Sequence, residues 1–186
     1  MQKDELIPPG WNYNPASWPQ RIPIIVLAFI GFVIAGYMGL YQLRVIEKVW
    51  EPFFGKGSIT ILNSPVSHFL PVPDAILGAL SYLFDVVAGA IGGPRRWRTM
   101  PWIVISFGVA VGPLGLVSVM LVVFQPVLFD AWCTLCLVTA GISVIMIGPS
   151  MDEVLASLQY LKRVKRSGES VWKGFWGFKS VVEKVK

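Results

Sequence analysis

Cysteine and histidine are nearly absent from this sequence. Its 186 residues include two cysteines and one histidine, which are too few for a zinc site built from four such ligands. Charge is also scarce: charged residues make up 15% of the chain, whereas hydrophobic residues make up 54% and the mean hydropathy is +0.62. Ordinary soluble domains carry about 25% charged residues. The composition therefore excludes an ordinary soluble domain and indicates a membrane protein.

Long apolar runs account for this composition. Four of them are long enough to cross the ~30 Å hydrocarbon core of a bilayer as helices: 22–43, 72–91, 101–124 and 131–149. The eight tryptophans and eighteen glycines fit this interpretation, because tryptophan collects at bilayer interfaces and glycine lets transmembrane helices pack closely. We therefore expect an all-α fold, a polytopic membrane four-helix bundle.

The apolar runs also divide the chain. We expect residues 1–21 to form a cytoplasmic or interfacial segment, 22–149 a domain of four transmembrane helices, and 150–186 a cytoplasmic tail. No small-residue cleavage site follows the first run, which favours a retained anchor over a removed signal peptide. The mature chain is therefore expected to begin near Met1.

The basic residues predict the orientation in the membrane. With the N-terminus in the cytoplasm, thirteen of the sixteen lysines and arginines lie inside, and only Arg44, Lys48 and Lys56 lie outside. Short cytoplasmic loops are typically rich in basic residues. Four spans then place both termini inside and the start of the fourth span outside, as expected for a protein of the bacterial inner membrane. The net charge of +5 reflects this topology, and we expect no nucleic-acid partner.

The segment between the first two runs has a helical pattern. Apolar residues from Val45 to Phe54 recur at helical spacing, opposite polar residues that include Arg44 and Glu51. This pattern predicts a short amphipathic helix, kinked at Pro52, that lies on the extracytoplasmic surface over the mouth of the bundle.

The C-terminal tail is also amphipathic. Residues 151–166 have an apolar and a basic face, and the aromatic residues from Trp172 to Phe178 alternate with lysines. We expect this tail to lie on anionic lipid, in preference to a dedicated partner site.

A basic turn joins the second and third runs. Gly92–Pro94 ends the second helix, and Arg95, Arg96 and Arg98 follow at the expected cytoplasmic interface. Asp85 lies inside the second run, where an ionisable residue is a functional candidate. A side chain at this depth can extend toward the interface, so we expect Asp85 to pair with Arg95 or Arg96.

Small residues predict close helix packing. Two spans carry them on one face, in the positions Ala28, Gly31, Ala35 and Gly39 of the first span and Gly108 and Gly112 of the third. Such faces let the backbones of neighbouring transmembrane helices approach. We interpret these glycines as packing features and not as parts of a ligand site.

The two cysteines form a Cys-x-x-Cys motif where the fourth run begins, in Trp132–Cys136. Cys133 and Cys136 can close a disulfide within one helical turn, and the free N–H groups and dipole of a helix start stabilise a thiolate. The predicted orientation places the motif on the side where disulfides persist. We therefore favour a redox-active pair over two idle buried cysteines.

With these motifs, the chain resembles the vitamin K epoxide reductase family from about 23 to 149. The matching elements are Trp132–Cys136, the serines of Asn63-Ser64 and Ser67, and Pro73-Asp74-Ala75 followed by Gly78 and Tyr82. The resemblance implies a four-helix membrane bundle with a dithiol at the outer end of the last helix. It also implies that electrons pass from a loop cysteine pair to this dithiol and then to a quinone.

The resemblance implies roles for four residues. Cys136 would face the quinone, and Cys133 would exchange with a disulfide partner. Asp74 stands where the family usually has an asparagine that hydrogen-bonds a quinone carbonyl, although an acid at a helix start is also a good cap. Trp132 would pack on the quinone or shield the thiols, unless it serves as an interfacial anchor.

Two positions depart from the family pattern. No cysteine precedes Cys133, and Ser58 stands near the place of the second loop cysteine. Ala140 replaces a tyrosine that contacts the quinone in the family. The electrons would then come from another protein, and the quinone site would be altered.

Two further residues have modest roles in this interpretation. Asp130 precedes the fourth span, and we expect it to cap that helix. For His68, the only histidine, we favour a solvated loop residue over a proton relay on the outer face.

The sequence thus predicts a membrane thiol:quinone oxidoreductase. It would oxidise dithiols of an extracytoplasmic thioredoxin-like partner and reduce a membrane quinone of the ubiquinone or menaquinone type. The alternative is a non-enzymatic member of the same family that serves as a structural subunit of a larger membrane complex, in contact with other membrane subunits, lipid and quinone.

Overall fold

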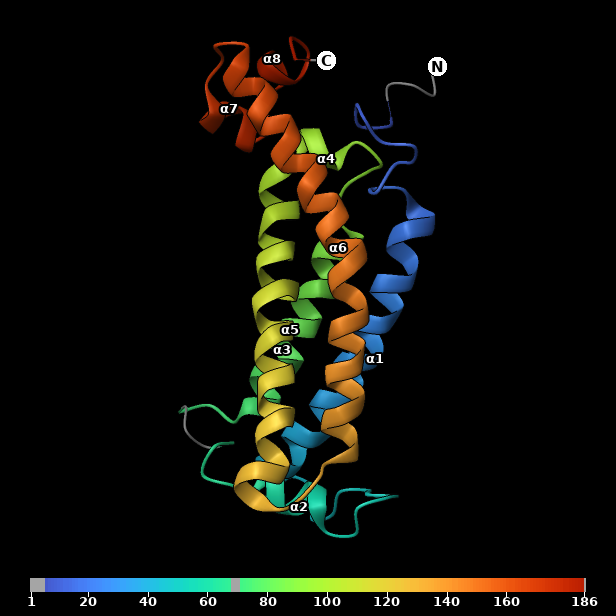
Figure 1. The fold of residues 1–186 in the computed structure, drawn as a ribbon, viewed down its shortest axis with the longest axis vertical. Coiled ribbons are helices and arrows are strands. Elements are labelled where there is room, and N and C mark those ends of the chain that lie inside the picture. Colours follow the sequence, from blue (N-terminus) through green and yellow to red (C-terminus); the bar gives the residue numbers. More distant parts are fainter. Residues whose placement is uncertain (1–5, 68–70, 186) are drawn as a thin grey trace.

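The computed structural model describes residues 6–67 and 71–185, which are helical or irregular and contain no strand. Four long helices run along the axis of an elongated bundle (Figure 1): α1 (Trp18–Gln42), α3 (Asp74–Ala90), α5 (Pro101–Phe129) and α6 (Thr134–Arg166). The short helices in the described residues are α2 (Gly57–Leu62), α4 (Arg96–Thr99), α7 (Val171–Phe175) and α8 (Lys179–Val182). The predicted all-α fold is confirmed.

Three of the long helices are long and apolar enough to cross a membrane. These are α1, α5 and α6, each of which contains an apolar stretch long enough to span the hydrocarbon core. Large apolar side chains on their outer faces are exposed, such as Phe29, Val109 and Val127, as expected for surfaces that contact lipid. The second predicted span forms α3, which has 17 residues and is therefore about 26 Å long. A fourth crossing of the membrane remains a prediction.

Each long helix packs on two others. α1 contacts α3 and α6, and α5 contacts α6 and α3, and buried residues of all four helices form a central cluster. Small residues make the closest approaches possible. A Cβ added at Gly31 of α1 would lie 2.6 Å from the ring of Tyr82 in α3, and one at Gly108 of α5 would overlap Val154 of α6. The predicted packing role of these glycines is confirmed.

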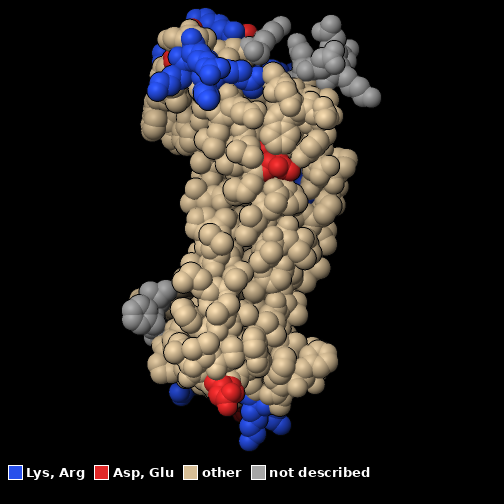
Figure 2. Space-filling view, in the orientation of Figure 1, with Lys and Arg blue, Asp and Glu red and all other residues tan. Residues whose placement is uncertain are grey.

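The two ends of the bundle differ in charge. The described residues before α1 lie at the same end as α4, α7 and α8, which we call the basic end, and α2 lies at the opposite end (Figure 1). Lysine and arginine gather at the basic end, fewer lie at the α2 end, and the middle of the visible face has none (Figure 2). This distribution suits a bundle whose middle lies in lipid. Which end faces the cytoplasm remains a prediction.

The predicted amphipathic helix over 45–54 is wrong. Residues 43–56 contain no helix, and the backbone at Arg44 is left-handed, with a φ of 60°. The carboxylate of Glu51 accepts hydrogen bonds from the backbone N–H groups of Phe53 and Phe54, and local bonds of this kind compete with helical ones. Trp50 and Phe53, expected on the buried face, are 65% and 77% exposed.

The C-terminal part continues the fourth predicted span. α6 runs through Pro149 to Arg166, so the expected boundary between domain and tail falls inside a single helix. The chain then folds back, so that α7 packs on α5 and α6 and α8 packs on α4. Gly177, with a φ of 71°, lies against the carbonyl of Thr99, where a Cβ would overlap it, and the ring of Trp176 lies 5.7 Å from that of Trp102. The tail is therefore packed on the end of the bundle.

Candidate active site

The two cysteines lie at the start of α6 and are joined as a disulfide, with their Cα atoms 5.2 Å apart. Cys133 is the N-cap of α6, and its Sγ accepts a hydrogen bond from the N–H of Cys136 at 3.2 Å. Asp130, expected in this capping role, instead ends α5 with a left-handed backbone. The N–H of Cys133 donates to Oε1 of Gln125 in α5 at 3.1 Å. These contacts hold both sulfurs at the junction of α5 and α6.

The loop before α2 closes over Cys133, which is 0% exposed. Oγ of Ser58 lies 3.3 Å from Sγ of Cys133 and donates a hydrogen bond to the carboxylate of Glu51. The same carboxylate accepts from the N–H and the hydroxyl of Thr134 in α6. Next to Ser58, Gly57 lies against the carbonyl of Trp132, where a Cβ would overlap the oxygen. Glu51 therefore fastens the loop to the first turn of the helix that carries the disulfide.

This role of Glu51 was not predicted from the sequence. Helical periodicity placed the residue on the polar face of a helix, whereas the side chain turns inward to Ser58 and Thr134. Pro52 and Gly55 on either side of two phenylalanines were a signal for a turn. Thr134, the partner in α6, lies 83 positions away in the sequence, so no local pattern could identify that contact.

The environment of Glu51 changes its acidity. Partial burial alone would raise its pKa, but the hydrogen bonds from Ser58, Thr134 and Phe53 favour the ionised form and lower the pKa from 4.5 to about 2. Glu51 is therefore a carboxylate throughout the physiological pH range. Its negative charge lies beside Cys133 and opposes formation of a thiolate there.

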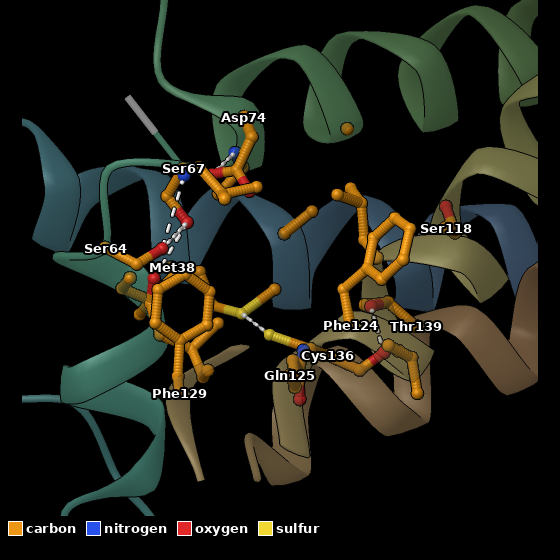
Figure 3. Close-up of a pocket in the computed structure, with 18 of the residues that line it drawn as sticks. Met38, Ser64, Ser67, Asp74, Ser118, Phe124, Gln125, Phe129, Cys136 and Thr139 are labelled. Atoms are coloured by element: carbon orange, nitrogen blue, oxygen red, sulfur yellow. Dashed lines mark hydrogen bonds between the residues drawn. The ribbon is translucent and has the colours of Figure 1, made fainter. Parts of the chain in front are cut away.

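A cavity of about 120 Å³ lies behind the disulfide, among the four long helices and α2 (Figure 3). Its wall is mostly apolar, and Cys136 contributes to it, with Sγ 3.8 Å from Sδ of Met38. A few polar residues also line it: Ser64, Ser67, Asp74, Tyr82, Ser118, Gln125 and Thr139. Of the two cysteines, Cys136 is the one that lines this cavity.

Asp74 lies in the first turn of α3 and lines the same cavity. Its Oδ1 accepts hydrogen bonds from Nε2 of Gln42 at 2.7 Å and from the N–H of Ala75 at 2.8 Å. The N-cap itself is Pro73. The carboxyl group thus interacts with the start of the helix and also borders the cavity, so both predicted roles remain compatible with its position.

Other predicted site residues lie elsewhere. Trp132 does not belong to the described lining of the cavity, and its ring packs 6.3 Å from that of Phe54 on the outer side. Ala140 is buried away from the cavity lining. The phenol in the cavity comes from Tyr82 of α3, whose hydroxyl donates to the carbonyl of Thr139 at 2.7 Å. His68 lies outside the described residues.

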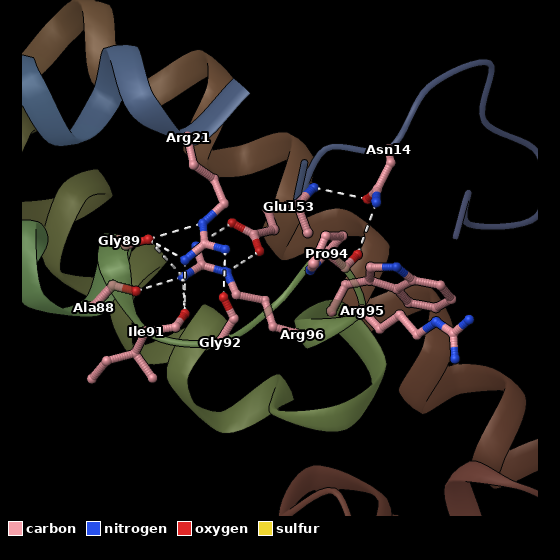
Figure 4. Close-up of polar contacts among 12 residues, drawn as sticks. Asn14, Arg21, Ala88, Gly89, Ile91, Gly92, Pro94, Arg95, Arg96 and Glu153 are labelled. Carbon is pink, nitrogen blue, oxygen red and sulfur yellow. Dashed lines mark hydrogen bonds and ion pairs between the residues drawn. The ribbon is translucent and has the colours of Figure 1, made fainter. Parts of the chain in front are cut away.

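The basic end holds a buried ionic cluster (Figure 4). Arg96 pairs with Glu153 of α6, and the two side chains are 1% and 2% exposed. Arg96 also donates to the carbonyls of Ala88 and Ile91, and Arg21 of α1 donates to that of Gly89. The last carbonyls of a helix have no helical partner and carry negative partial charge, so the two guanidinium groups satisfy the end of α3. Arg96 is therefore buried within the protein, and its position at a membrane interface remains a prediction.

Asp85 does not pair with Arg96, because Glu153 takes that position. The Asp85 side chain is 3% exposed, and its Oδ1 has no hydrogen-bond partner among the described residues. The other buried acid among the described residues, Glu153, has a direct counter-ion. Asp85 therefore differs from it.

The disulfide at the start of the last long helix, beside an apolar cavity among four helices, has the arrangement that the resemblance implies. The sequence model of the Vitamin K epoxide reductase family matches residues 22–150. The chain belongs to this family. A search of curated proteins found no match. Vitamin K epoxide reductases generally use quinones and belong to the membrane thiol-disulfide oxidoreductases.

This vitamin K epoxide reductase family member has Ser58, not a cysteine, beside the disulfide. A serine cannot exchange electrons with Cys133, so the sulfur chemistry within the described chain is confined to Cys133 and Cys136. In the described residues no group of three or more His, Cys, Asp or Glu could hold a metal ion. The site therefore offers one dithiol, one cavity and polar groups around both.

Removing the charge of Glu153 should destabilise the bundle. In Glu153→Gln the buried Arg96 loses its counter-ion, and breaking a buried pair costs about 3–5 kcal/mol. We expect a clear fall in the thermal unfolding midpoint of the protein in detergent. Glu169→Gln, which breaks an exposed pair with Lys184, should have little effect. Equal effects of the two substitutions would contradict the assignment.

Glu51 should make the stability of the folded protein depend on pH in the acid range. Its pKa is lower in the folded protein than the usual 4.5, so its contribution is present above about pH 4.5 and is lost as the pH falls toward 2. The unfolding midpoint should drop more between pH 6 and pH 3 in the wild type than in Glu51→Gln. Glu47→Gln, at an exposed position of the same loop, should behave as the wild type. A drop in Glu51→Gln as large as in the wild type would show that Glu51 is not the group responsible.

Proposed function

We propose that the protein is a membrane thiol:quinone oxidoreductase. It oxidises dithiols of an extracytoplasmic, thioredoxin-like partner and passes the electrons to a membrane quinone of the ubiquinone or menaquinone type. The observation that carries this proposal is the position of the disulfide, with Cys136 on the cavity wall and Cys133 under the outer loop. In this proposal α3 also spans the membrane, which gives four spans with α1, α5 and α6. Both termini are cytoplasmic, and the disulfide faces the outer side of the bacterial inner membrane.

The cavity suits the head group of a quinone. Small aromatic ligands bind in mostly apolar cavities that present a few placed polar groups, and this cavity has that character. Asp74 and Ser67 lie together on the polar side of the cavity (Figure 3). In this proposal Asp74 contacts a quinone oxygen, to which it can donate a hydrogen bond only as a neutral acid. When bound, a quinone supplies an acceptor for two electrons and two protons.

Cys133 is the sulfur that a partner attacks in this proposal. A partner thiolate forms a mixed disulfide with Cys133 and releases Cys136 as a thiolate, and the second partner thiol then displaces Cys133, so that the partner leaves oxidised. The freed Cys136 lies on the cavity wall, where its two electrons can be passed on. The N–H of Cys136, directed at Sγ of Cys133, stabilises negative charge on that sulfur.

Partner access requires movement of the loop before α2. Cys133 is fully buried, and Glu51 and Ser58 lie over it. Trp50 and Phe53 in the same loop are largely exposed and offer an apolar surface to a partner. Because the loop has no cysteine of its own, the partner itself must bring the electrons.

A structural subunit is the second candidate function. The full burial of Cys133 and the absence of a loop cysteine favour it. In that case the disulfide would be a permanent structural cross-link at the α5–α6 junction, and neither thiols nor quinone would change its redox state.

Quinone reduction by the purified protein separates these functions. With dithiothreitol as the thiol source, the wild type should reduce a soluble quinone analogue, followed by the absorbance of the quinone. Cys136→Ser should lower the rate by about a hundredfold or more, because the covalent step is lost. Val144→Ala, on the exposed face of the same helix, is the control and should keep the rate. A rate independent of Cys136, or no reduction by the wild type, would contradict the enzyme.

Asp74 should affect quinone binding more than turnover. Asp74→Ala removes a hydrogen-bonding group from the cavity and should raise the KM for the quinone about tenfold, which corresponds to the loss of one hydrogen bond. Asp74→Asn restores the residue usual in the family and should keep the KM within about twofold. If both substitutions change KM equally, or neither does, Asp74 does not contact the quinone.

A further inference from the structure

A second cavity, of about 220 Å³, adjoins the first. The two share residues of α3 and α5 that include Gly78, Tyr82 and Ser118. The second cavity extends along α3 away from the disulfide and reaches Asp85, eleven residues and therefore about 16 Å beyond Asp74. Nothing in the proposed dithiol chemistry uses this space.

Asp85 gives this cavity an unusual lining. Asp85 is only 3% exposed, and its Oδ1 has no hydrogen-bond partner among the described residues. An ionised carboxylate without a partner is costly in an apolar interior, and ionisable residues within membrane helices commonly serve transport or proton relay. As a neutral carboxyl group, Asp85 carries a proton that it can give to the cavity.

Polar groups continue from Asp85 toward the disulfide. Tyr82, one turn earlier in α3, lines both cavities, and its hydroxyl lies 2.7 Å from Oγ of Ser143 in α6 and donates to the carbonyl of Thr139. Thr139 lines the first cavity together with Cys136. The Tyr82 hydroxyl thus lies between Asp85 and the proposed quinone site.

Polar groups also follow Asp85 toward the basic end. One turn later, the carbonyls of Ala88 and Gly89 are bound by Arg96 and Arg21 (Figure 4). The charged groups at this end of α3 are Arg96, which pairs with Glu153 and binds carbonyls, and Arg21, which binds carbonyls. The described lining from α5 is apolar apart from Ser118, and that from α6 comprises Ser143 and Met146.

We propose that Asp85 carries protons from the basic end of the bundle to the quinone site, an inference that rests on the proposed function. Two electrons leave the Cys133–Cys136 dithiol, which closes to the disulfide, and its two protons leave at the α2 end. The quinone gains these two electrons and two protons that Asp85 delivers in turn. Water at the basic end returns each proton to Asp85. Each turnover therefore moves charge across the membrane.

Labelling with a hydrophobic carbodiimide tests the proton-carrying state without any quinone. The reagent reacts with protonated carboxyl groups, and mass spectrometry of the full chain in lipid vesicles locates the adduct. We expect labelling of Asp85 at neutral pH, its loss in Asp85→Asn, and weak labelling of the partly exposed Asp152, whose carboxylate accepts a bond from Tyr13. Asp152→Asn should leave the Asp85 adduct unchanged. An unlabelled Asp85 in the folded wild type would overturn the inference.

Proton uptake tests the route. In vesicles with the basic end inside, oxidation of external dithiothreitol by a soluble quinone analogue should make the lumen alkaline, as reported by a trapped pH dye. Asp85→Asn should lower this signal at least tenfold, a modest loss for a removed proton donor, and Asp85→Glu should restore it. A full signal in Asp85→Asn, or quinone reduction in the wild type with no alkaline shift, overturns the inference and leaves the proposed function standing. No quinone reduction in the wild type would instead defeat the function, whatever Asp85 labelling shows.

Discussion

The ion pair between Arg96 and Glu153 is the contact on which the rest of the bundle depends. It joins the turn after α3 to the middle of α6, while Arg96 and Arg21 together satisfy the last carbonyls of α3. These carbonyls would otherwise lack partners in an apolar surrounding, where each unsatisfied group costs several kcal/mol. The pair therefore sets the register of α3 against α6. That register matters because α3 supplies Asp74 and Tyr82 to the cavity, and α6 supplies Cys136.

At the other end of α6, the carboxylate of Glu51 has a comparable role. It connects the loop before α2 to Thr134 and places Ser58 beside Cys133. The disulfide thus lies between the Glu51 carboxylate with its hydrogen-bond partners on one side and the apolar cavity on the other. In the proposed function this arrangement separates the two exchanges: thiols reach Cys133 only when the loop opens, and the quinone meets Cys136 from within the bundle.

The sequence predicted those features that depend on local pattern. Apolar run length identified the segments that became α1, α3, α5 and α6, and the small residues that include Gly31 and Gly108 predicted close packing. The spacing and helix-start position of Cys133 and Cys136 predicted their proximity. The failures concern contacts between distant residues. Helical periodicity put Glu51 on a solvent face, and the basic turn favoured a pairing of Arg96 with Asp85. Both failed because the actual partners, Thr134 of Glu51 and Glu153 of Arg96, lie 83 and 57 positions away.

The central claim is that Cys133 and Cys136 pass electrons to a membrane quinone. The most direct measurement is the redox state of this pair in native membranes, determined by rapid alkylation and mass shift before and after quinone is added to quinone-depleted, reduced samples. The account predicts that free thiols on both residues convert to a disulfide when quinone is supplied. Thiols that stay reduced with quinone, or a disulfide that resists both thiols and quinone, would contradict it and favour a structural subunit.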